Sequence, residues 1–103
     1  MENLKLIVER EMREYAGEGL NGYTYFTKSD NQTIMSIVFV GQIDEQQFTT
    51  TSMMVRVVAD RIIIEDDKTN KPLIDALLQA GVPRDQIVLA YACRLENRRN
   101  SVI

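Results

Sequence analysis

The chain has 103 residues, of which 45% are hydrophobic and 26% are charged, and its formal net charge is −3 at pH 7. These values are typical of one soluble, folded domain and exclude a disordered chain. Because the sequence has no histidine and one cysteine, imidazole-dependent nucleophilic sites, a soft zinc site and an internal disulfide are excluded within it. The negative charge argues against non-specific DNA binding, which needs a surplus of Lys and Arg.

The N-terminal part of the chain predicts a helix followed by two strands. The apolar residues of the helix recur at three- and four-residue intervals, and they are Leu4, Ile7, Val8, Met12 and Tyr15. We expect this helix to end at Gly17. From residue 23 the apolar period changes to two, which predicts antiparallel strands over residues 23–27 and 33–41 with a turn at 29–32. Residues 34–40 are almost all apolar, so we expect a central strand covered on both faces, by helices or by a second subunit.

Two further strands are predicted after a polar break at residues 42–47. The segment 48–58 is rich in threonine at first and apolar later, which is typical of a third strand. Ala59 and Asp60 then form a tight turn into a fourth strand over residues 61–65, and we expect Asp60 to take the positive φ. The aromatic residues between positions 23 and 26, together with Met53 and Met54, lie in period-two segments, so we expect them in the core.

A second amphipathic helix is predicted after the fourth strand. Thr69 or Asn70 can cap its N-terminus, with Pro72 in the first turn, and the helix should end at Gly81. Its expected buried residues are Leu73, Leu77 and Leu78. Pro83, Arg84 and Asp85 then turn the chain into an extended segment over residues 87–92.

These elements predict a single α+β domain over residues 1–103. It consists of an N-terminal helix, a four-stranded antiparallel meander sheet, a second helix packed on the sheet, and a short C-terminal strand or extended segment, with residues 95–103 as a frayed tail. No apolar run is long enough for a membrane helix, and charges interrupt the first ten residues as they would not in a signal peptide. We therefore expect a cytoplasmic protein that does not insert into membranes.

One short pattern could carry enzyme chemistry. Asp66 and Lys68 follow a predicted strand, as in metal-dependent nucleases, where acids hold Mg²⁺ and a lysine helps to activate water; Asp60 or Asp44 could be the upstream acid. The same acidic run before a helix would also favour the positive end of the helix dipole, and short matches of this kind are common. We therefore expect no catalytic residues, no metal and no cofactor, and keep the nuclease as the alternative.

A second pattern could contact nucleic acid. Arg94, Arg98 and Arg99 lie close together in the sequence, Tyr91 could stack on a base, and Arg84 could extend the basic patch. A solvated basic tail explains the same residues, and the negative net charge favours that explanation. Direct contact with DNA is therefore left open.

The order of strand, polar loop, helix, glycine stop and proline turn in the second half of the chain resembles the XisI family, the fdxN-element excision controlling factors. The corresponding segments are Val40-Gly41, residues 62–64, Asp67 with Thr69, Ala80-Gly81-Val82-Pro83 and Ile87-Val88-Leu89. The N-terminal helix ending in Tyr15-Ala16 is also similar, so the resemblance covers roughly residues 4–93. Most of these positions are turns and core residues, which are specific to a fold and say little about chemistry.

The chain departs from the family pattern at several places. Gln42 stands where the family typically has a tryptophan, Ile63 stands where it has an aromatic residue, and Ala59-Asp60 replaces an Asp-Gly turn. The family's proline-rich C-terminal segment is replaced by residues 91–98. If the missing aromatic residues contact a partner, this chain binds a different partner or binds with altered specificity.

The resemblance implies a non-catalytic accessory or controlling factor that acts with a second small protein, XisH, in the programmed excision of a DNA element. The largest departure from the family is the best place for a partner-specific surface, and its residues are Tyr91, Arg94, Arg98, Arg99 and the nearby Arg84. A homodimer is a further expectation, because strand 34–40 or strand 48–58 could pair or pack across a two-fold axis.

Overall fold

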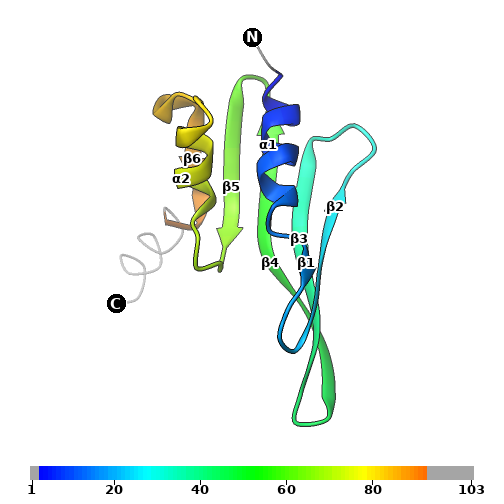
Figure 1. Cartoon of the computed structure of the whole chain (residues 1–103). Helices are drawn as coiled ribbons and strands as arrows, with labels where there is room; N and C mark the ends of the chain where they lie inside the picture. The colour runs from blue at the N-terminus through cyan, green and yellow to red at the C-terminus, as the bar shows by residue number, and fades with distance from the viewer. Residues whose placement is uncertain (1–2, 93–103) are drawn as a thin grey trace, which may run out of the picture.

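A computed structural model describes residues 3–92, and in it one six-stranded sheet carries two α-helices on the same face (Figure 1). The elements in chain order are α1 (Leu4–Arg13), β1 (Gly17–Glu18), β2 (Gly22–Lys28), β3 (Ile34–Ile43), β4 (Gln46–Val58), β5 (Arg61–Asp67), α2 (Leu73–Gln79), the 3-10 helix η1 (Arg84–Gln86) and β6 (Ile87–Leu89). The α+β class predicted from the sequence is confirmed. Neither α-helix of the described residues is long and apolar enough to cross a membrane.

The sheet has six strands, so the predicted number of four is wrong, although the four predicted strands, β2 to β5, do form an antiparallel meander. The strands lie in chain order, and β1 to β5 pair antiparallel. The short β1 adds to one edge, and β6 pairs parallel with β5 at the other after a crossover through α2. The predicted C-terminal strand therefore exists, but it ends at Leu89 and makes the sheet mixed.

The core lies between the helices and one face of the sheet. Among the described residues, all the buried side chains of the core are hydrophobic. They come from both helices, from β3 to β6 and from the loop before η1: Ile7, Val8, Met12, Met35, Ile37, Met53, Val55, Val57, Ile62, Ile64, Leu73, Leu77, Val82 and Ile87. The helical and period-two spacings of the sequence thus place one stripe of each element in the core.

The strands β3 and β4 continue through the polar segment that was predicted to separate them. Asp44 and Glu45 alone form the turn, with φ angles of 50° and 68°, as a tight two-residue hairpin requires. β4 pairs with β5 only from Met53 to Val58, whereas it pairs with β3 from Gln46 to Arg56. Residues 38–51 therefore form an extension beyond the end of β5, which we call the arm, that projects from the domain (Figure 1). β2 pairs with the base of the arm as far as Gly41, and the remainder is two-stranded.

Two local predictions fail at the ends of β4 and β5. In the turn between them, Ala59 takes the positive φ, of 55°, and Asp60 does not, because the left-handed residue is the first of the two turn residues. The N-cap residue of α2 is Pro72, so neither Thr69 nor Asn70 caps the helix. The cap hydrogen bond comes from Asp67, whose Oδ2 accepts from the Leu73 amide at 2.8 Å. Thr69 instead supports the cap, since its amide and hydroxyl donate to Asp67 Oδ1 at 2.9 and 2.6 Å.

The remaining predictions for the second helix are confirmed at some positions and wrong at others. Leu73 and Leu77 are buried, and Gly81, with a φ of 98°, follows the helix end as expected. Leu78 was expected in the core but is 41% exposed, because it falls outside the apolar stripe that faces the sheet. Pro72 precedes the helix rather than lying in its first turn.

A cluster of charges around Glu9 fastens α1 to the β2–β3 hairpin. Glu9 Oε1 lies 3.0 Å from Lys28 Nζ, its Oε2 lies 2.8 Å from Arg13 Nη2, and the Gln32 side-chain amide donates to Oε1 at 2.6 Å. These groups, Lys28 first and Arg13 next, lower the pKa of Glu9 to about 2. The folded state therefore favours the ionised carboxylate.

We expect Glu9→Gln to destabilise the protein near neutral pH and to have no effect near pH 2. Because the pKa of Glu9 in the folded state is below its usual value of 4.5, its contribution is present above pH 4.5 and is lost as the pH falls towards 2. With the side chain 15% exposed, we expect a loss of about 1 kcal/mol at pH 7, discounted for solvent screening. Urea denaturation at both pH values measures this, with the exposed Glu18→Gln as control; equal losses at both pH values would contradict it.

Candidate protein-interaction surface

The face of the sheet opposite the helices carries apolar side chains that nothing else in residues 3–92 covers. The registers place on this face the residues that alternate with the core positions of β2 to β6. Its apolar members, which we call the open face, are Tyr23, Tyr25, Ile34, Val38, Val40, Met54, Val58, Ile63 and Val88. The helices of residues 3–92 therefore cover one face of residues 34–40, and the expectation that a second subunit covers the other face stays a prediction.

Two tyrosines of β2 form the most exposed aromatic part of the open face. Tyr23 and Tyr25 are 43% and 49% exposed, and their ring centroids lie 4.6 Å apart. Opposite them on β3 lie Val40, 36% exposed, and Val38. Tyr23 and Tyr25 were predicted in the core, but only Phe26, which faces the helices, packs against it.

A charged pair crosses the open face further along the sheet. The Arg56 guanidinium donates to Glu65 at 2.7 Å, with its side chain 43% exposed. A register shift in β5 beside Met54 and Val55 brings Glu65 to this position. Apolar side chains, Ile34 and Ile63, are the direct cross-strand neighbours of Arg56. The open face thus combines an apolar surface with a fixed polar pair.

The predicted partner-specific residues lie elsewhere. Arg84 is exposed in η1, and its Nη1 donates to the Ile87 carbonyl at 2.8 Å, while Tyr91 follows the other end of β6 and is half-buried against the core. Burial and, to a smaller extent, Asp67 raise the pKa of Tyr91. Arg94, Arg98 and Arg99, like the tail 95–103, lie outside the described residues, so this surface stays a prediction.

The acids of the nuclease alternative lie apart from one another. Asp66 lies 3.7 Å from Lys68, at the end of β5, whereas Asp60 lies in the turn before β5, about 20 Å away at the usual rise of a strand. Asp44 lies at the tip of the arm. Within residues 3–92 no three acidic or cysteine side chains form a group that could hold a metal ion.

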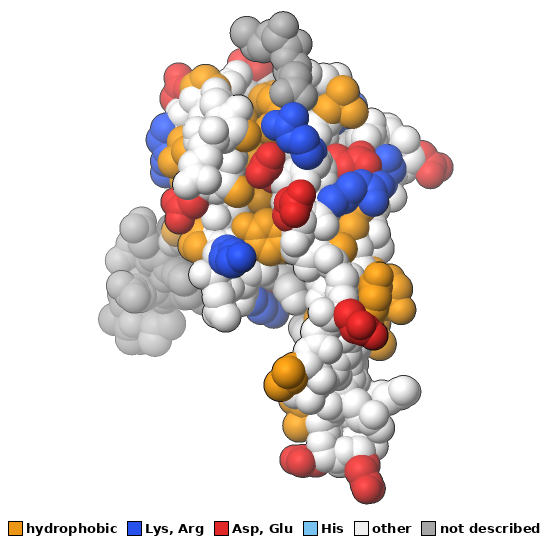
Figure 2. Space-filling view, in the orientation of Figure 1, with side chains coloured by type: hydrophobic (Ala, Val, Ile, Leu, Met, Phe, Trp, Pro, Cys, Tyr) orange, Lys and Arg blue, Asp and Glu red, His pale blue; other side chains and the backbone are white. Residues whose placement is uncertain are grey.

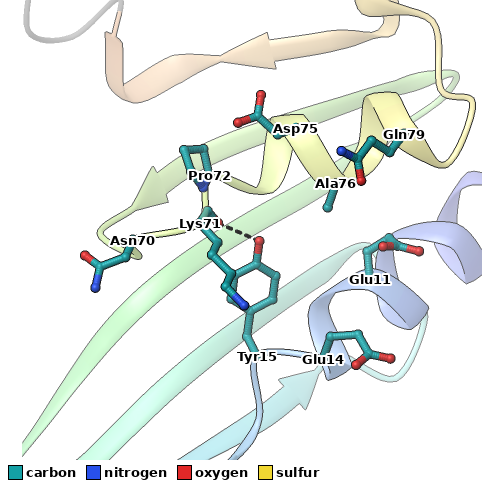
Figure 3. A pocket seen from close by; sticks show the side chains of 9 residues that line it. All are labelled: Glu11, Glu14, Tyr15, Asn70, Lys71, Pro72, Asp75, Ala76 and Gln79. Atoms are coloured by element: carbon teal, nitrogen blue, oxygen red, sulfur yellow. Dashed lines mark hydrogen bonds between the residues drawn. The ribbon is translucent and has the colours of Figure 1, made fainter.

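A cleft of about 510 Å³ separates the C-terminal end of α1 from the start of α2 (Figure 3). Its main polar contact is the Tyr15 hydroxyl, which donates to the Lys71 carbonyl at 2.6 Å. Burial is the main cause that raises the pKa of Tyr15. Figure 3 shows Asp75 pointing away from Glu11 and Glu14, so the carboxylates of the cleft do not converge on one point as a pair of acid and base would.

The sequence predicted that both faces of residues 34–40 are apolar, but it did not identify the face that the helices leave uncovered or place Tyr23 and Tyr25 on it. The available signal was that β2 and β3 carry large apolar residues at successive positions, so both faces of the sheet had to be apolar. The described chain supplies helices for one face only. Contact with another protein is the interaction that such an apolar surface with aromatic residues best supports.

The sequence and the fold are similar to those of known proteins. The sequence matches the family model described as XisI protein over residues 2–101. Among solved structures, the fold is similar to a XisI-like protein from Anabaena variabilis ATCC 29413, with 15% sequence identity, a TM-score of 0.68, and coverage of 84% of this chain and 82% of that one. It is also similar to the fdxN element excision controlling factor XisI from the same organism, with 18% identity, a TM-score of 0.57, and coverage of 84% and 83%. No curated protein matches the sequence. Because the family model spans almost the whole chain, the protein belongs to the XisI family.

Proposed function

We propose that this protein is a non-catalytic controlling factor in the programmed excision of a DNA element, and that it acts in the cytoplasm by binding an XisH-like protein through the open face. Membership of the XisI family and the fold shared with an excision controlling factor support the first part. The observation that carries the second part is an apolar sheet face with two exposed tyrosines.

The composition of the open face is suited to protein binding. Soluble monomers rarely expose large contiguous apolar surfaces unless these bind something. Tyrosine is enriched among the residues that dominate interface energies, because it buries a large rigid ring and keeps a polar hydroxyl. Tyr23 and Tyr25 lie side by side at the end of the sheet that continues into the arm. They are therefore the residues that we expect to anchor the partner.

A non-catalytic role is supported by what the described residues hold. Asp67, the acid next to Asp66, already accepts three hydrogen bonds from Thr69 and Leu73. This acidic segment thus has a structural use that does not involve a reaction.

We expect Tyr25→Ser to weaken binding to an XisH-like protein from the same genome at least ~30-fold, as loss of an anchoring aromatic costs about 2 kcal/mol or more. Co-purification followed by calorimetric titration measures the affinity. The matched control is Leu6→Ser, which removes an apolar side chain that is 54% exposed on α1, away from the open face. This control should bind as the unmodified chain does.

Two results would overturn the proposal. Equal affinities for the Tyr25→Ser and Leu6→Ser variants would remove the open face as the binding surface. Mg²⁺-dependent DNA cleavage by this chain alone, lost in Asp66→Ala, would show that the protein is an enzyme and contradict a non-catalytic role.

A further inference from the structure

One edge of the arm is an unpaired β-strand. β3 pairs with β2 from Met35 to Gly41 and with β4 up to the turn, so both of its sides are occupied there. On β4, however, β5 pairs only from Met53 onward, and the Lys68 amide donates to the Ser52 carbonyl at 2.8 Å as the chain leaves the sheet. Within residues 3–92 no strand pairs with the outer side of residues 46–51.

The register identifies the backbone groups that face outward on this edge. In a two-residue hairpin the residues that flank the turn form a hydrogen-bonded pair, and here they are Ile43 and Gln46. Every second residue of β4 then bonds to β3, and those between them point the other way. The amides and carbonyls of Gln47, Thr49 and Thr51 therefore face outward from the sheet.

This edge lacks the devices that usually prevent pairing with another chain. Natural edge strands carry lysine, proline or inward-pointing charges, or are very short. Residues 46–52 read Gln-Gln-Phe-Thr-Thr-Thr-Ser, with neither charge nor proline. The β-branched threonines also favour the extended conformation. The edge of the arm is thus prepared to accept a further strand.

We propose that the strand that completes this edge is the same edge of a second copy, paired antiparallel about a two-fold axis near Thr49. An antiparallel strand here would run in the direction of β5 and continue its line from the point where β5 ends. Self-pairing sets Thr49 against Thr49 and Gln47 against Thr51, so no like charges meet. A two-fold pairing is closed, so it yields a dimer and not a fibre.

One cation of the second copy, Lys68, would lie opposite the acidic tip of the arm. Acidic side chains lie at the free end of the arm (Figure 2), where the sequence has Asp44 and Glu45. In the antiparallel pairing this tip reaches the place where the partner copy leaves its sheet at Lys68. The Lys68 side chain is 61% exposed and lies 3.7 Å from Asp66. The arm therefore carries an uncharged, self-complementary edge, and its acidic tip meets Lys68 of the second copy beside Asp66 and Asp67.

The first test is the mass in solution of Thr49→Pro and Thr49→Ser variants, measured by sedimentation equilibrium. Proline at position 49 removes an outward amide and leaves the bonds to β3 in place, whereas serine keeps the edge. We expect twice the chain mass of 11.8 kDa for the unmodified protein and the serine variant, and at least a tenfold weaker dimer for the proline variant. Thr49→Lys, which sets two like charges across the axis, should weaken it equally if proline unfolds the arm.

The second test is charge exchange. Lys68→Glu should weaken the dimer, and Lys68→Glu with Glu45→Lys should restore it. A monomeric mass for the unmodified chain up to about 0.5 mM, beyond the range of most specific complexes, would overturn the proposal. So would a dimer that survives both Thr49→Pro and Thr49→Lys. Because these measurements use the chain alone, failure here leaves binding to an XisH-like protein through the open face unaffected, and the reverse also holds.

Discussion

Asp67→Ala is expected to lower the free energy of unfolding by about 3 kcal/mol, because a charged acceptor of several hydrogen bonds is removed from a partly buried site. Asp67 accepts from the Leu73 amide at 2.8 Å and from the Thr69 amide and hydroxyl at 2.9 and 2.6 Å. Leu73 is fully buried, so water cannot easily replace the lost acceptor at its amide. Urea denaturation followed by circular dichroism measures the change.

The neighbouring acid provides the control for this prediction. Asp66→Ala removes a carboxylate whose ion pair with Lys68 is long, at 3.7 Å, and solvent-exposed, so the expected loss is within about 0.5 kcal/mol. Asp67→Asn, which keeps one oxygen acceptor, should fall between the two. If Asp66→Ala and Asp67→Ala destabilise the protein equally, negative charge near the start of α2 stabilises the protein, and the hydrogen bonds of Asp67 make no specific contribution.

The hydrogen bonds of this cap explain the role of one of the segments that resemble the XisI family. In the sequence, Asp67 and Thr69 were singled out as a segment that resembles the family, next to the Asp66 of the nuclease alternative. In the structure their hydrogen bonds connect the end of β5 to the start of α2, six residues later. The same turn directs α2 onto the sheet, where Leu73 and Leu77 are buried. The loop therefore stabilises the fold.

Hydrophobic periodicity predicted the long elements well and the short ones poorly. α1, β2, β3, β4 and β5 each contain enough residues to show a period of 3.6 or 2. β1, with two residues, shows no period, and the pairing partner and direction of the three-residue β6 depend on the crossover through α2. The polar residues 42–47 were misassigned because the end of the arm lies beyond the helices, where neither face of a strand needs apolar residues.

The candidate surface was harder to predict than the fold. A strand that is apolar on both faces can be covered by a helix, by a second sheet or by another protein, and its sequence is similar in all three cases. Tyr23 and Tyr25 were therefore assigned to the core, although only the position of α1 decides which face of β2 is covered. The free edge of β4 depends on where β5 ends, which is set by the turn at Lys68.

Gly22→Ala is expected to destabilise the protein by about 3 kcal/mol, because it introduces a methyl group where two strands meet closely. Gly22 of β2 lies opposite Gly41 of β3. A Cβ at position 22 would collide with the Val40 carbonyl oxygen and the Gly41 Cα, which are backbone atoms, so the ladder itself would have to move. The Phe39 ring lies over both glycines, which explains why Val40-Gly41, another segment that resembles the family, needs glycine.

The environments of three glycines predict an order of effects that urea denaturation can measure. A Cβ at Gly41 would collide most closely with the Phe39 ring, a side chain that can rotate, and would meet one backbone atom, the Asn21 carbonyl oxygen, at 2.9 Å. We therefore expect a smaller loss for Gly41→Ala, about 1–2 kcal/mol. At Gly19 the nearest atom would lie at an ordinary contact distance of 3.6 Å, so Gly19→Ala should change the stability by less than about 0.5 kcal/mol. Equal losses for Gly22→Ala and Gly19→Ala would mean that the β2–β3 contact at the base of the arm is looser than the structure has it.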